Sequence, residues 1–340
     1  MIDLRSDTIT RPTEAMLESM REASFGDDSR DGDETVARLE ALAAERMGKE
    51  AAAYMPSGTM TNLVAVLAHT QRGGEVLLEA GAHIINSELG GITAVAGAFY
   101  KGIPGHRGAM DLEKLAQAIR PRTRQNFGTA LVCMETTHNR AGGAVLPLEA
   151  MRAVCDLASS NGVPVHIDGA RVFNAAVKLG MPVKQLCDGF DTVSVCLSKG
   201  LGTPAGTVLV GKKDVIERAR RIRKMLGGTM RQVGILGAAG LYALEHNVDR
   251  LAEDHANAEK LARGLAALGL PVDPVQTNMV FVQVPKEQAA ALKQHLSDNG
   301  VVTLGGAKMR LVTHLDVDSA GIDRALSVFG SFFRKAAAAD

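Results

Sequence analysis

Tryptophan is absent from this chain of 340 residues, and aromatic side chains make up only 4% of it. Proteins that hold single-stranded nucleic acid usually stack bases on aromatic side chains, so we expect no such platform. An excess of charge of one sign is also lacking, because 38 basic residues balance 38 acidic ones. Without a cationic field, the chain is not expected to bind nucleic acids or anionic membranes in general.

Cysteines and long apolar runs are scarce as well. The four cysteines have no CxxC spacing and lie in apolar surroundings, which indicates reduced core residues and neither a disulfide framework nor a metal site. The uncharged segment 233–244 is too short to cross a bilayer, which takes roughly 20 residues. The first residues lack the cationic start and apolar block of a secretion signal. We therefore expect a cytoplasmic protein that binds no metal.

Strand-like apolar runs alternate with amphipathic helical patterns along most of the chain, which predicts an α/β fold with a parallel sheet covered by helices. The pattern changes near residue 247, where more highly charged helices and two further strands predict a small α+β domain. A chain of this length is typical of two domains, and we place them at 1–247 and 248–340. The expected strands are 75–79, 130–134, 163–167, 192–197, 207–210, 279–284 and 310–313, and the expected helices are 35–46, 59–70, 148–160 and 286–298.

The stretch CLSKGLGTPAGTVLVG, residues 196–211, places a single lysine at the end of an apolar strand. The glycines around Lys199 would let a flat ligand approach the backbone closely. A lysine that is partly removed from water can attack a carbonyl carbon as the free amine. A strand-end lysine whose ammonium group faces solvent is the alternative.

An aspartate, Asp168, ends the apolar strand in VPVHIDGAR. Open α/β sheets bind ligands at the carboxyl ends of their strands. A carboxylate that pairs with a protonated pyridine nitrogen, together with a Schiff-base lysine, is what a pyridoxal 5′-phosphate (PLP) site requires. The alternative is a helix N-cap. His166 lies on the same strand face as Asp168, and we interpret it as a supporting residue.

A candidate phosphate site precedes the helix expected at 59–70. The segment Pro56-Ser57-Gly58-Thr59 leads directly into that helix, where free backbone N–H groups and the helix dipole can hold a dianion. The hydroxyl groups of Ser57 and Thr59 add two donors. Turns and helix caps use the same residue types, so this segment carries weight only together with the lysine and the aspartate.

A set of short motifs in a fixed order extends over essentially the whole chain. They are SDTITRPT, GDD, PSGTMTN, GAH, ETTHN, HIDGARVFNA, CLSKGLGTP, GTMRQ and MRLVTHLD. With these motifs the chain resembles the low-specificity L-threonine aldolases, PLP enzymes of fold type I in the β-eliminating lyase superfamily. The resemblance implies a mostly parallel, seven-stranded sheet in the large domain.

The resemblance also implies how the cofactor is held. Lys199 would form the covalent link to PLP, and Asp168 would bind its pyridine nitrogen. Arg171 would contact the 3-oxygen of the ring and His83 would stack on its face. Ser57, Gly58 and Thr59 would hold the phosphate.

The substrate site and the assembly follow from the same resemblance. Ser6 and Arg310 would bind the carboxylate of the amino-acid substrate. Arg231, in GTMRQ, would reach the site from a neighbouring subunit, because these enzymes are dimers or tetramers with shared active sites. We therefore expect a homo-oligomer, with a tetramer as one of the two possibilities.

Two departures from the family pattern concern the substrate. Members usually carry a histidine before the strand that leads into ETTHN, whereas this chain has Gln125 or Asn126 there. An amide can hydrogen-bond a hydroxyl group but cannot take its proton near neutral pH, which leaves His83, or a water that it holds, as the candidate base. The family's tyrosine in the GDD segment is replaced by Arg30, which could favour a polar or anionic β-substituent or could pair with a nearby aspartate.

The implied activity is a retro-aldol cleavage of L-threonine, L-allo-threonine or a related β-hydroxy-α-amino acid to glycine and an aldehyde. The two departures motivate an alternative, PLP-dependent β-elimination from a differently substituted amino acid. A third interpretation, a sensor or regulator of the same fold without enzymatic activity, would require an output module that 340 residues do not accommodate.

Overall fold

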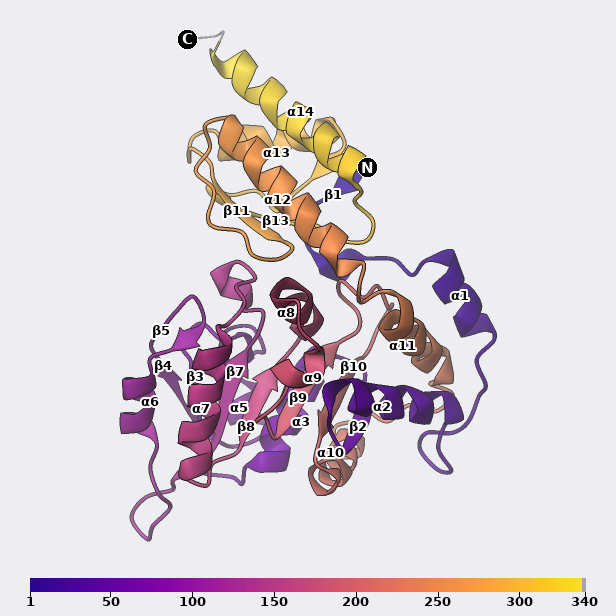
Figure 1. Cartoon of the computed structure of the whole chain (residues 1–340), viewed down its shortest axis with the longest axis vertical. Coiled ribbons are helices and arrows are strands. Elements are labelled where there is room, and N and C mark those ends of the chain that lie inside the picture. Colours follow the sequence, from indigo (N-terminus) through magenta and orange to yellow (C-terminus); the bar gives the residue numbers. More distant parts are fainter. Residues whose placement is uncertain (338–340) are drawn as a thin grey trace.

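The computed structural model of the chain describes residues 1–337, with side chains to residue 334, so the last three residues of the expected small domain lie outside it. A larger body built on a sheet carries a smaller one in which α12 (Leu251–Ala267), α13 (Ala289–Asp298) and α14 (Ser319–Ala337) are prominent (Figure 1). Within the described residues no helix is long and apolar enough to cross a membrane.

A seven-stranded sheet forms the centre of the larger body, in the order β2-β10-β9-β8-β7-β3-β4. Only β10 is antiparallel to its neighbours, which confirms the mostly parallel sheet that we expected. The strands are β2 (Ala51–Met55), β3 (Glu75–Glu79), β4 (Phe99–Ile103), β7 (Thr129–Glu135), β8 (Val165–Asp168), β9 (Thr192–Cys196) and β10 (Thr207–Gly211).

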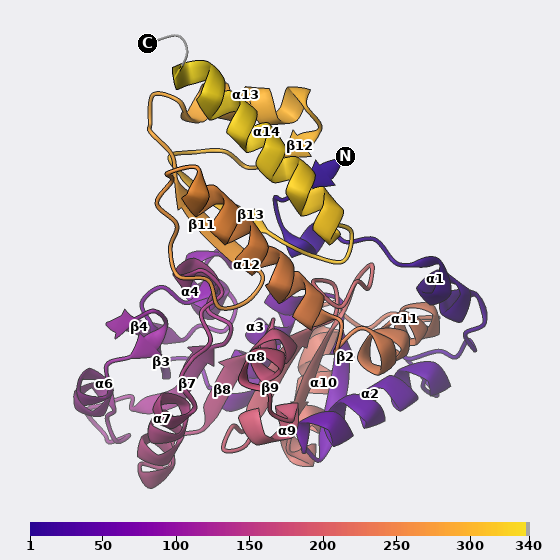
Figure 2. The ribbon, with the colours of Figure 1, turned by 45° about the horizontal axis from the view of Figure 1, so that its top comes forward.

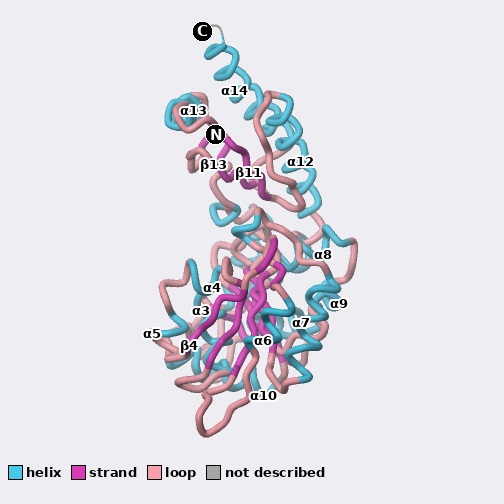
Figure 3. Tube along the Cα trace, turned by 90° about the vertical axis from the view of Figure 1, so that its left-hand side faces the viewer, coloured by secondary structure: helices cyan, strands magenta, loops and turns pink. Residues whose placement is uncertain are grey.

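Helices cover both faces of this sheet, as the side view shows (Figure 3). Every residue of β8, β9 and β10 is therefore buried, which explains why these strands are apolar along their length rather than alternating. One face packs against α3 (Gly58–His69), α4 (His83–Asn86), α5 (Gly91–Ala94) and α10 (Lys213–Met225). The other packs against α2 (Glu34–Met47), α6 (Leu112–Ala118), α7 (Leu148–Ser160), α8 (Val172–Leu179) and α9 (Val183–Leu186).

Local sequence signals fix the ends of these helices. The side chain of Asp33 caps α2 by accepting a hydrogen bond from the N–H group of Val36, and Gly48 ends the helix in the left-handed conformation, with φ of 62°. The helix α11 (Gly234–His246), rich in glycine and alanine, packs closely on α2 and on α1 (Glu14–Arg21).

The smaller body has its own apolar core around an antiparallel pair, β11 (Met279–Gln283) and β13 (Lys308–Val312). Seen from a second angle, α12 runs from this body down to the larger one (Figure 2). The remaining elements are β1 (Ile2–Asp3), β5 (Gly105–His106), β6 (Ala109–Met110), β12 (Val301–Val302) and the 3-10 helices at Asp7–Ile9 and Asn139–Ala141.

The first residues of the chain differ from the domain division that we expected. The strand β1 pairs in parallel with β12, and Ile2 and Leu4 are buried in the core of the smaller body. The assignment of the whole segment 1–247 to the large domain is therefore corrected at its start. The reason is a pairing between the two ends of the chain, which local patterns do not reveal.

Candidate active site

The carboxyl ends of β2, β8 and β9 open on one pocket of about 370 Å³, a size typical of small-molecule sites. Six residues singled out in the sequence line it, namely Ser57, Gly58, Thr59, His83, Asp168 and Lys199. The topology explains why they meet, because β2, β8 and β9 run in the same direction and their ends lie at the same edge of the sheet.

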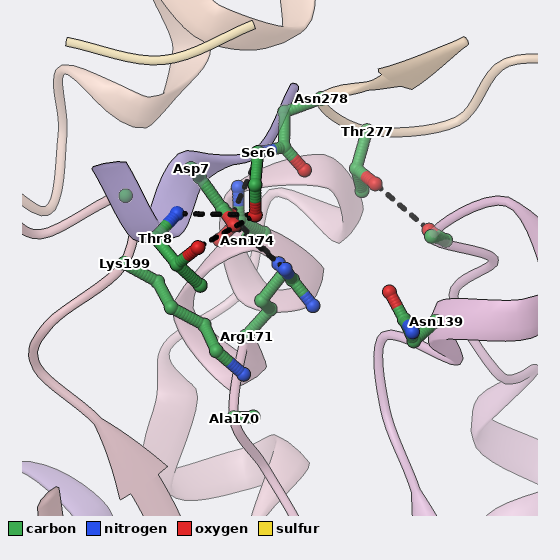
Figure 4. A network of polar contacts seen from close by, with 12 residues as sticks. Ser6, Asp7, Thr8, Asn139, Ala170, Arg171, Asn174, Lys199, Thr277 and Asn278 are labelled. Atoms are coloured by element: carbon green, nitrogen blue, oxygen red, sulfur yellow. Dashed lines mark hydrogen bonds and ion pairs between the residues drawn. The ribbon is translucent and has the colours of Figure 1, made fainter. Parts of the chain in front are cut away.

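Lys199 lies in the turn after β9, half-buried, and the pocket exposes its side chain. Its carbonyl oxygen accepts a hydrogen bond of 2.9 Å from the hydroxyl group of Thr10, which ties the turn to the N-terminal segment. Figure 4 shows the amine of Lys199 extending towards Arg171 and Ala170. Gly200 lets the turn pack closely, since a Cβ atom there would lie 2.8 Å from a methyl group of Leu251.

Asp168 is 3% exposed and is held from two directions. One carboxylate oxygen accepts a hydrogen bond of 3.1 Å from the N–H group of Ala170. The other accepts one of 2.9 Å from the side-chain amide of Asn62, on α3. The sequence analysis missed Asn62, although its position in PSGTMTN, one helical turn after the phosphate segment, was a usable signal.

His83 is the first residue of α4 and lines the same pocket. Its backbone N–H group donates to the carboxylate of Glu135 over 2.6 Å, and its Nδ1 atom contacts the carboxylate of Glu88 at 2.8 Å. The hydrogen bond to Glu88 raises the pKa of His83 above its ordinary value. Glu88, 7% exposed, is a second residue that sequence reasoning missed, because nothing local marks it as a partner of His83.

The N-terminus of α3 forms one wall. The hydroxyl group of Ser57 caps the helix by accepting from the N–H group of Met60 at 3.3 Å. The first backbone N–H groups of a helix have no acceptor within the helix, so those of Gly58 and Thr59 are available to an anion. A Cβ atom at Gly58 would lie 3.0 Å from the sulfur of Cys196, so a larger residue would crowd this wall.

Arg171 lies just beyond Asp168 and is buried. Its guanidinium donates two hydrogen bonds of 2.7 Å to the carboxylate of Asp7, which also accepts one of 3.1 Å from the amide of Asn278. Burial alone would raise the pKa of Asp7, but the charge and hydrogen bonds of Arg171 outweigh it and hold that pKa well below the ordinary value. Asp7, which we had left out of the expected site, therefore positions Arg171.

Arg310, on β13, extends from the smaller body. Its guanidinium donates to the hydroxyl group of Ser6 at 3.4 Å and to the side-chain oxygen of Asn139 at 3.3 Å. Its Nε atom is buried without a hydrogen-bond partner among the described residues. Burial and the nearby positive charge of Arg171 lower the pKa of Arg310. The guanidinium group of Arg310 therefore has too little negative charge around it. A substrate carboxylate would supply that charge.

Six expected site residues are not among those that line this pocket, namely Ser6, Arg30, Gln125, Arg171, Arg231 and Arg310. Arg231 has a side chain that is 66% exposed and pairs with Asp27 at 3.1 Å. Arg30 is exposed. Gln125 lies in the exposed loop before β7, at the amino end of that strand and so at the opposite edge of the sheet from Lys199. The substrate contacts expected of Gln125 and Arg30 therefore stay predictions, and within this chain neither side chain lines the pocket.

The residues present fit PLP. Its phosphate matches the free N–H groups of α3, its ring nitrogen matches the buried carboxylate of Asp168, and its aldehyde requires an amine such as that of Lys199. The Nε atom of Arg310 has no hydrogen-bond partner among the described residues, so it is free to donate to a substrate carboxylate. Together, this sheet edge and this set of side chains define a PLP enzyme of fold type I.

Comparison with known proteins identifies the family to which the chain belongs. A family model described as beta-eliminating lyase matches residues 3–287, and the chain belongs to that family. It is 44% identical to low-specificity L-threonine aldolase 1 of Arabidopsis thaliana, over 96% of this chain and 95% of the relative. It is 46% identical to the low specificity L-threonine aldolase of Escherichia coli K12, over 93% and 95%. A solved Leishmania major threonine aldolase superposes with a TM-score of 0.86 at 20% identity, covering 98% of this chain and all of that one.

Proposed function

We propose that this protein is a PLP-dependent aldolase that cleaves L-threonine, L-allo-threonine or a related β-hydroxy-α-amino acid to glycine and an aldehyde. The observation that carries the proposal is the convergence of Lys199, Asp168 and the N-terminus of α3 on one pocket. Close relatives that bear the name low-specificity L-threonine aldolase support it. When bound, PLP supplies an electron-withdrawing ring that accepts the electrons of the breaking Cα–Cβ bond.

The chain's own residues bind and orient the substrate. The fork of Arg310, assisted by the hydroxyl group of Ser6, binds the carboxylate at one end. Fixing that carboxylate would restrict the rotation about Cα and so orient the bond to Cβ. With PLP bound, Asp168 would hold a proton on the ring nitrogen, and Lys199 would hold the cofactor through its amine.

The proton on the β-hydroxyl group must leave as the aldehyde forms. The Nδ1 atom of His83 is engaged by Glu88, while no described residue hydrogen-bonds its Nε2 atom. We propose that this Nε2 atom accepts the proton of the β-hydroxyl group, either directly or through one water molecule. Removal of this proton would let the C=O bond of the aldehyde form as the Cα–Cβ bond breaks. PLP would supply the acceptor for the electrons of that bond, and glycine would result once Cα takes up a proton.

The assembly is part of the proposal. Arg231 is exposed and does not line the pocket of its own chain, which suits a residue that completes the site of a second subunit. Leu89, Met225 and Phe25 are large apolar side chains with exposed fractions of 99%, 70% and 62%, and such side chains are commonly covered by association. We therefore propose a homo-oligomer, a dimer or a tetramer, with shared sites. Four buried, free cysteines favour the cytoplasm as its compartment.

A product assay tests the activity. The PLP-loaded protein is incubated with L-threonine and with L-allo-threonine, and glycine and acetaldehyde are measured together. Equimolar release of both products is expected, and Lys199→Ala should release neither. Absence of turnover of both substrates by the fully loaded protein would exclude this substrate class. Release of pyruvate and ammonia from serine-like substrates, without an aldehyde, would select β-elimination instead.

A labelling experiment tests the site itself. Borohydride reduction of the loaded protein should attach the cofactor irreversibly to the peptide that contains Lys199. A label on Lys213 or Lys224, both on α10, would show that the site is misplaced.

A further inference from the structure

Asp168 lies at one end of a line of polar side chains between α3 and the strands β8 and β9 of the sheet. From Asp168 the line runs through Asn62 and His166 to Thr192 and ends at His69, the last residue of α3. His166 and Thr192 are 0% exposed. Buried polar groups are costly unless each donor meets an acceptor, so the direction of every hydrogen bond can be worked out.

The orientation of the Asn62 amide is set by the groups on its two sides. Its nitrogen donates both hydrogens to carboxylates, one to Glu88 at 2.8 Å and one to Asp168 at 2.9 Å. Its oxygen accepts from the hydroxyl group of Ser194 at 2.9 Å. A flipped amide would turn its oxygen towards two carboxylates, so only this orientation satisfies all of its neighbours.

The tautomer of His166 follows from this orientation. Its Nε2 atom lies 3.2 Å from the oxygen of Asn62, which has no hydrogen to give, so Nε2 carries the proton. Burial lowers the pKa of His166 to about 4, which keeps the ring neutral at ordinary pH. The Nδ1 atom is then an acceptor, and its partner at 2.9 Å is the hydroxyl group of Thr192.

The last bond is fixed in the same way. The hydroxyl group of Thr192 has one hydrogen, which goes to His166, so its oxygen accepts from the Nε2 atom of His69 at 3.0 Å. All the donors in the line therefore point in one direction, from His69 towards Asp168. Hydrogen bonds in such a chain polarise one another, and the end of this one presents an N–H group to the carboxylate that faces the cofactor.

We propose that His69, Thr192 and His166 are positioning residues that lock the amide of Asn62 with its nitrogen towards Asp168 and Glu88. The locked amide stabilises the anion of Asp168, which in turn keeps the proton on the ring nitrogen of the cofactor. The same amide holds Glu88, the partner of His83. The side chain of Asn62, on α3, thus aligns the groups at the ring nitrogen and at the ring face. This inference rests on the proposed binding of PLP.

A pair of substitutions separates positioning from packing. His166→Gln can place an amide nitrogen near the position of Nε2 and keep the donor to Asn62, whereas His166→Leu removes it. Thr192→Val is isosteric and removes only the bridging hydroxyl group, so it serves if the leucine variant fails to fold. His255→Leu is the matched control, because His255 is also buried, 6% exposed, and lies outside the line.

The first measurement needs no cofactor. In the PLP-free protein labelled with ¹⁵N-histidine, the nitrogen shifts of His166 should show a neutral ring with the proton on Nε2 between pH 6 and pH 8. The assignment comes from the signal that disappears in His166→Gln. A proton on Nδ1, or a charged ring in this range, would overturn the deduced direction of the line.

The second measurement reads the ring nitrogen directly. Each variant is reconstituted with PLP carrying ¹⁵N in its ring, and the nitrogen shift is recorded. The wild type, His166→Gln and His255→Leu should show a protonated pyridine. His166→Leu should move towards the unprotonated value, and Thr192→Val should move in the same direction by a smaller amount. An unchanged shift in both His166→Leu and Thr192→Val would overturn the proposal, whereas failure of the wild type to bind PLP would refute the proposed function instead.

Discussion

The carboxylate of Asp7 and the guanidinium of Arg171, 164 positions apart in the chain, face each other through two parallel hydrogen bonds of 2.7 Å in a fully buried setting. Asn278, of the smaller body, donates to the same carboxylate. The pair therefore joins three distant segments beside the pocket and fixes Arg171, three residues after Asp168.

Removal of one member of this pair should be costly. Asp7→Asn leaves the charge of Arg171 buried without a counter-ion, and we expect a loss of about 3–5 kcal/mol in the free energy of unfolding. Chemical denaturation followed by circular dichroism measures it. Asp3→Asn, at an exposed pair with Arg5, is the matched control and should lose much less. Equal losses in the two variants would contradict the role given to Asp7.

Arg310 should act on the substrate carboxylate through its planar fork. Arg310→Lys keeps the charge but loses the paired hydrogen bonds, each charged hydrogen bond contributing about 1.5–3 kcal/mol. The expected result is a roughly 10- to 100-fold fall in kcat/KM, mostly through a higher KM. Steady-state kinetics with L-threonine measure it, and absorbance shows whether the cofactor is retained. A variant with unchanged KM would place the carboxylate elsewhere.

The acid limb of the pH profile should report on His83. The neighbouring carboxylate of Glu88 stabilises the protonated ring and so raises the pKa of His83, and a base must be unprotonated to act. Glu88→Gln should therefore lower the pKa of His83 and move the acid limb of kcat to lower pH. Rates measured from pH 5 to pH 9 test this. Movement to higher pH, or none at all, would argue against His83 as the proton acceptor.

Stability should fall at mildly acid pH because a histidine is buried uncharged. Burial lowers the pKa of His255 to about 4, against 6.5 for an unperturbed histidine, and its Nε2 atom accepts a hydrogen bond of 3.1 Å from Asn174. Between these values the unfolded chain binds a proton that the folded chain does not, so stability decreases as the pH falls from 6.5 to 4. The loss from this one group amounts to about 3 kcal/mol.

His255→Gln removes the titrating group and should flatten that part of the curve. Unfolding free energies of the two proteins at pH 7, 6, 5 and 4 provide the comparison. The free energy of unfolding of the wild type, relative to that of the variant, should fall by about 3 kcal/mol between pH 7 and pH 4. A constant difference across the series would show that the folded state protonates as readily as the unfolded one.

The sequence predicted most of the sheet because its strands are apolar runs with clear boundaries. The strand at 75–79 and the helix at 148–160 have the predicted bounds, and the other expected elements are displaced by a few residues at most. The strands β2 and β4 were not predicted. An alanine-rich run such as 51–55 has weak strand propensity, and β4 has Phe99 and Tyr100 exposed, so neither shows the pattern of a buried strand.

The residues expected to bind the cofactor were easier to predict than the residues that hold them in place. Lys199, Asp168 and Ser57 lie at the ends of strands that finish at the same edge of the sheet. Their positions after apolar runs in the sequence predict this arrangement. Asn62, Glu88 and Asp7 act through contacts between elements that only the folded chain brings together. Arg30 and Gln125 do not line the pocket of this chain, and a position in a motif does not say which side of the molecule the side chain faces.

The parallel pairing of β1 with β12 has a consequence for how the molecule is made. Ile2 aligns with Val301 and Asp3 with Val302, so the first strand has no partner until the segment that contains Val301 and Val302 has been synthesised. Ser6 follows that strand by three residues and contacts Arg310, which is synthesised later still. The first strand and the contact between Ser6 and Arg310 can therefore form only after all seven strands of the large sheet have been synthesised.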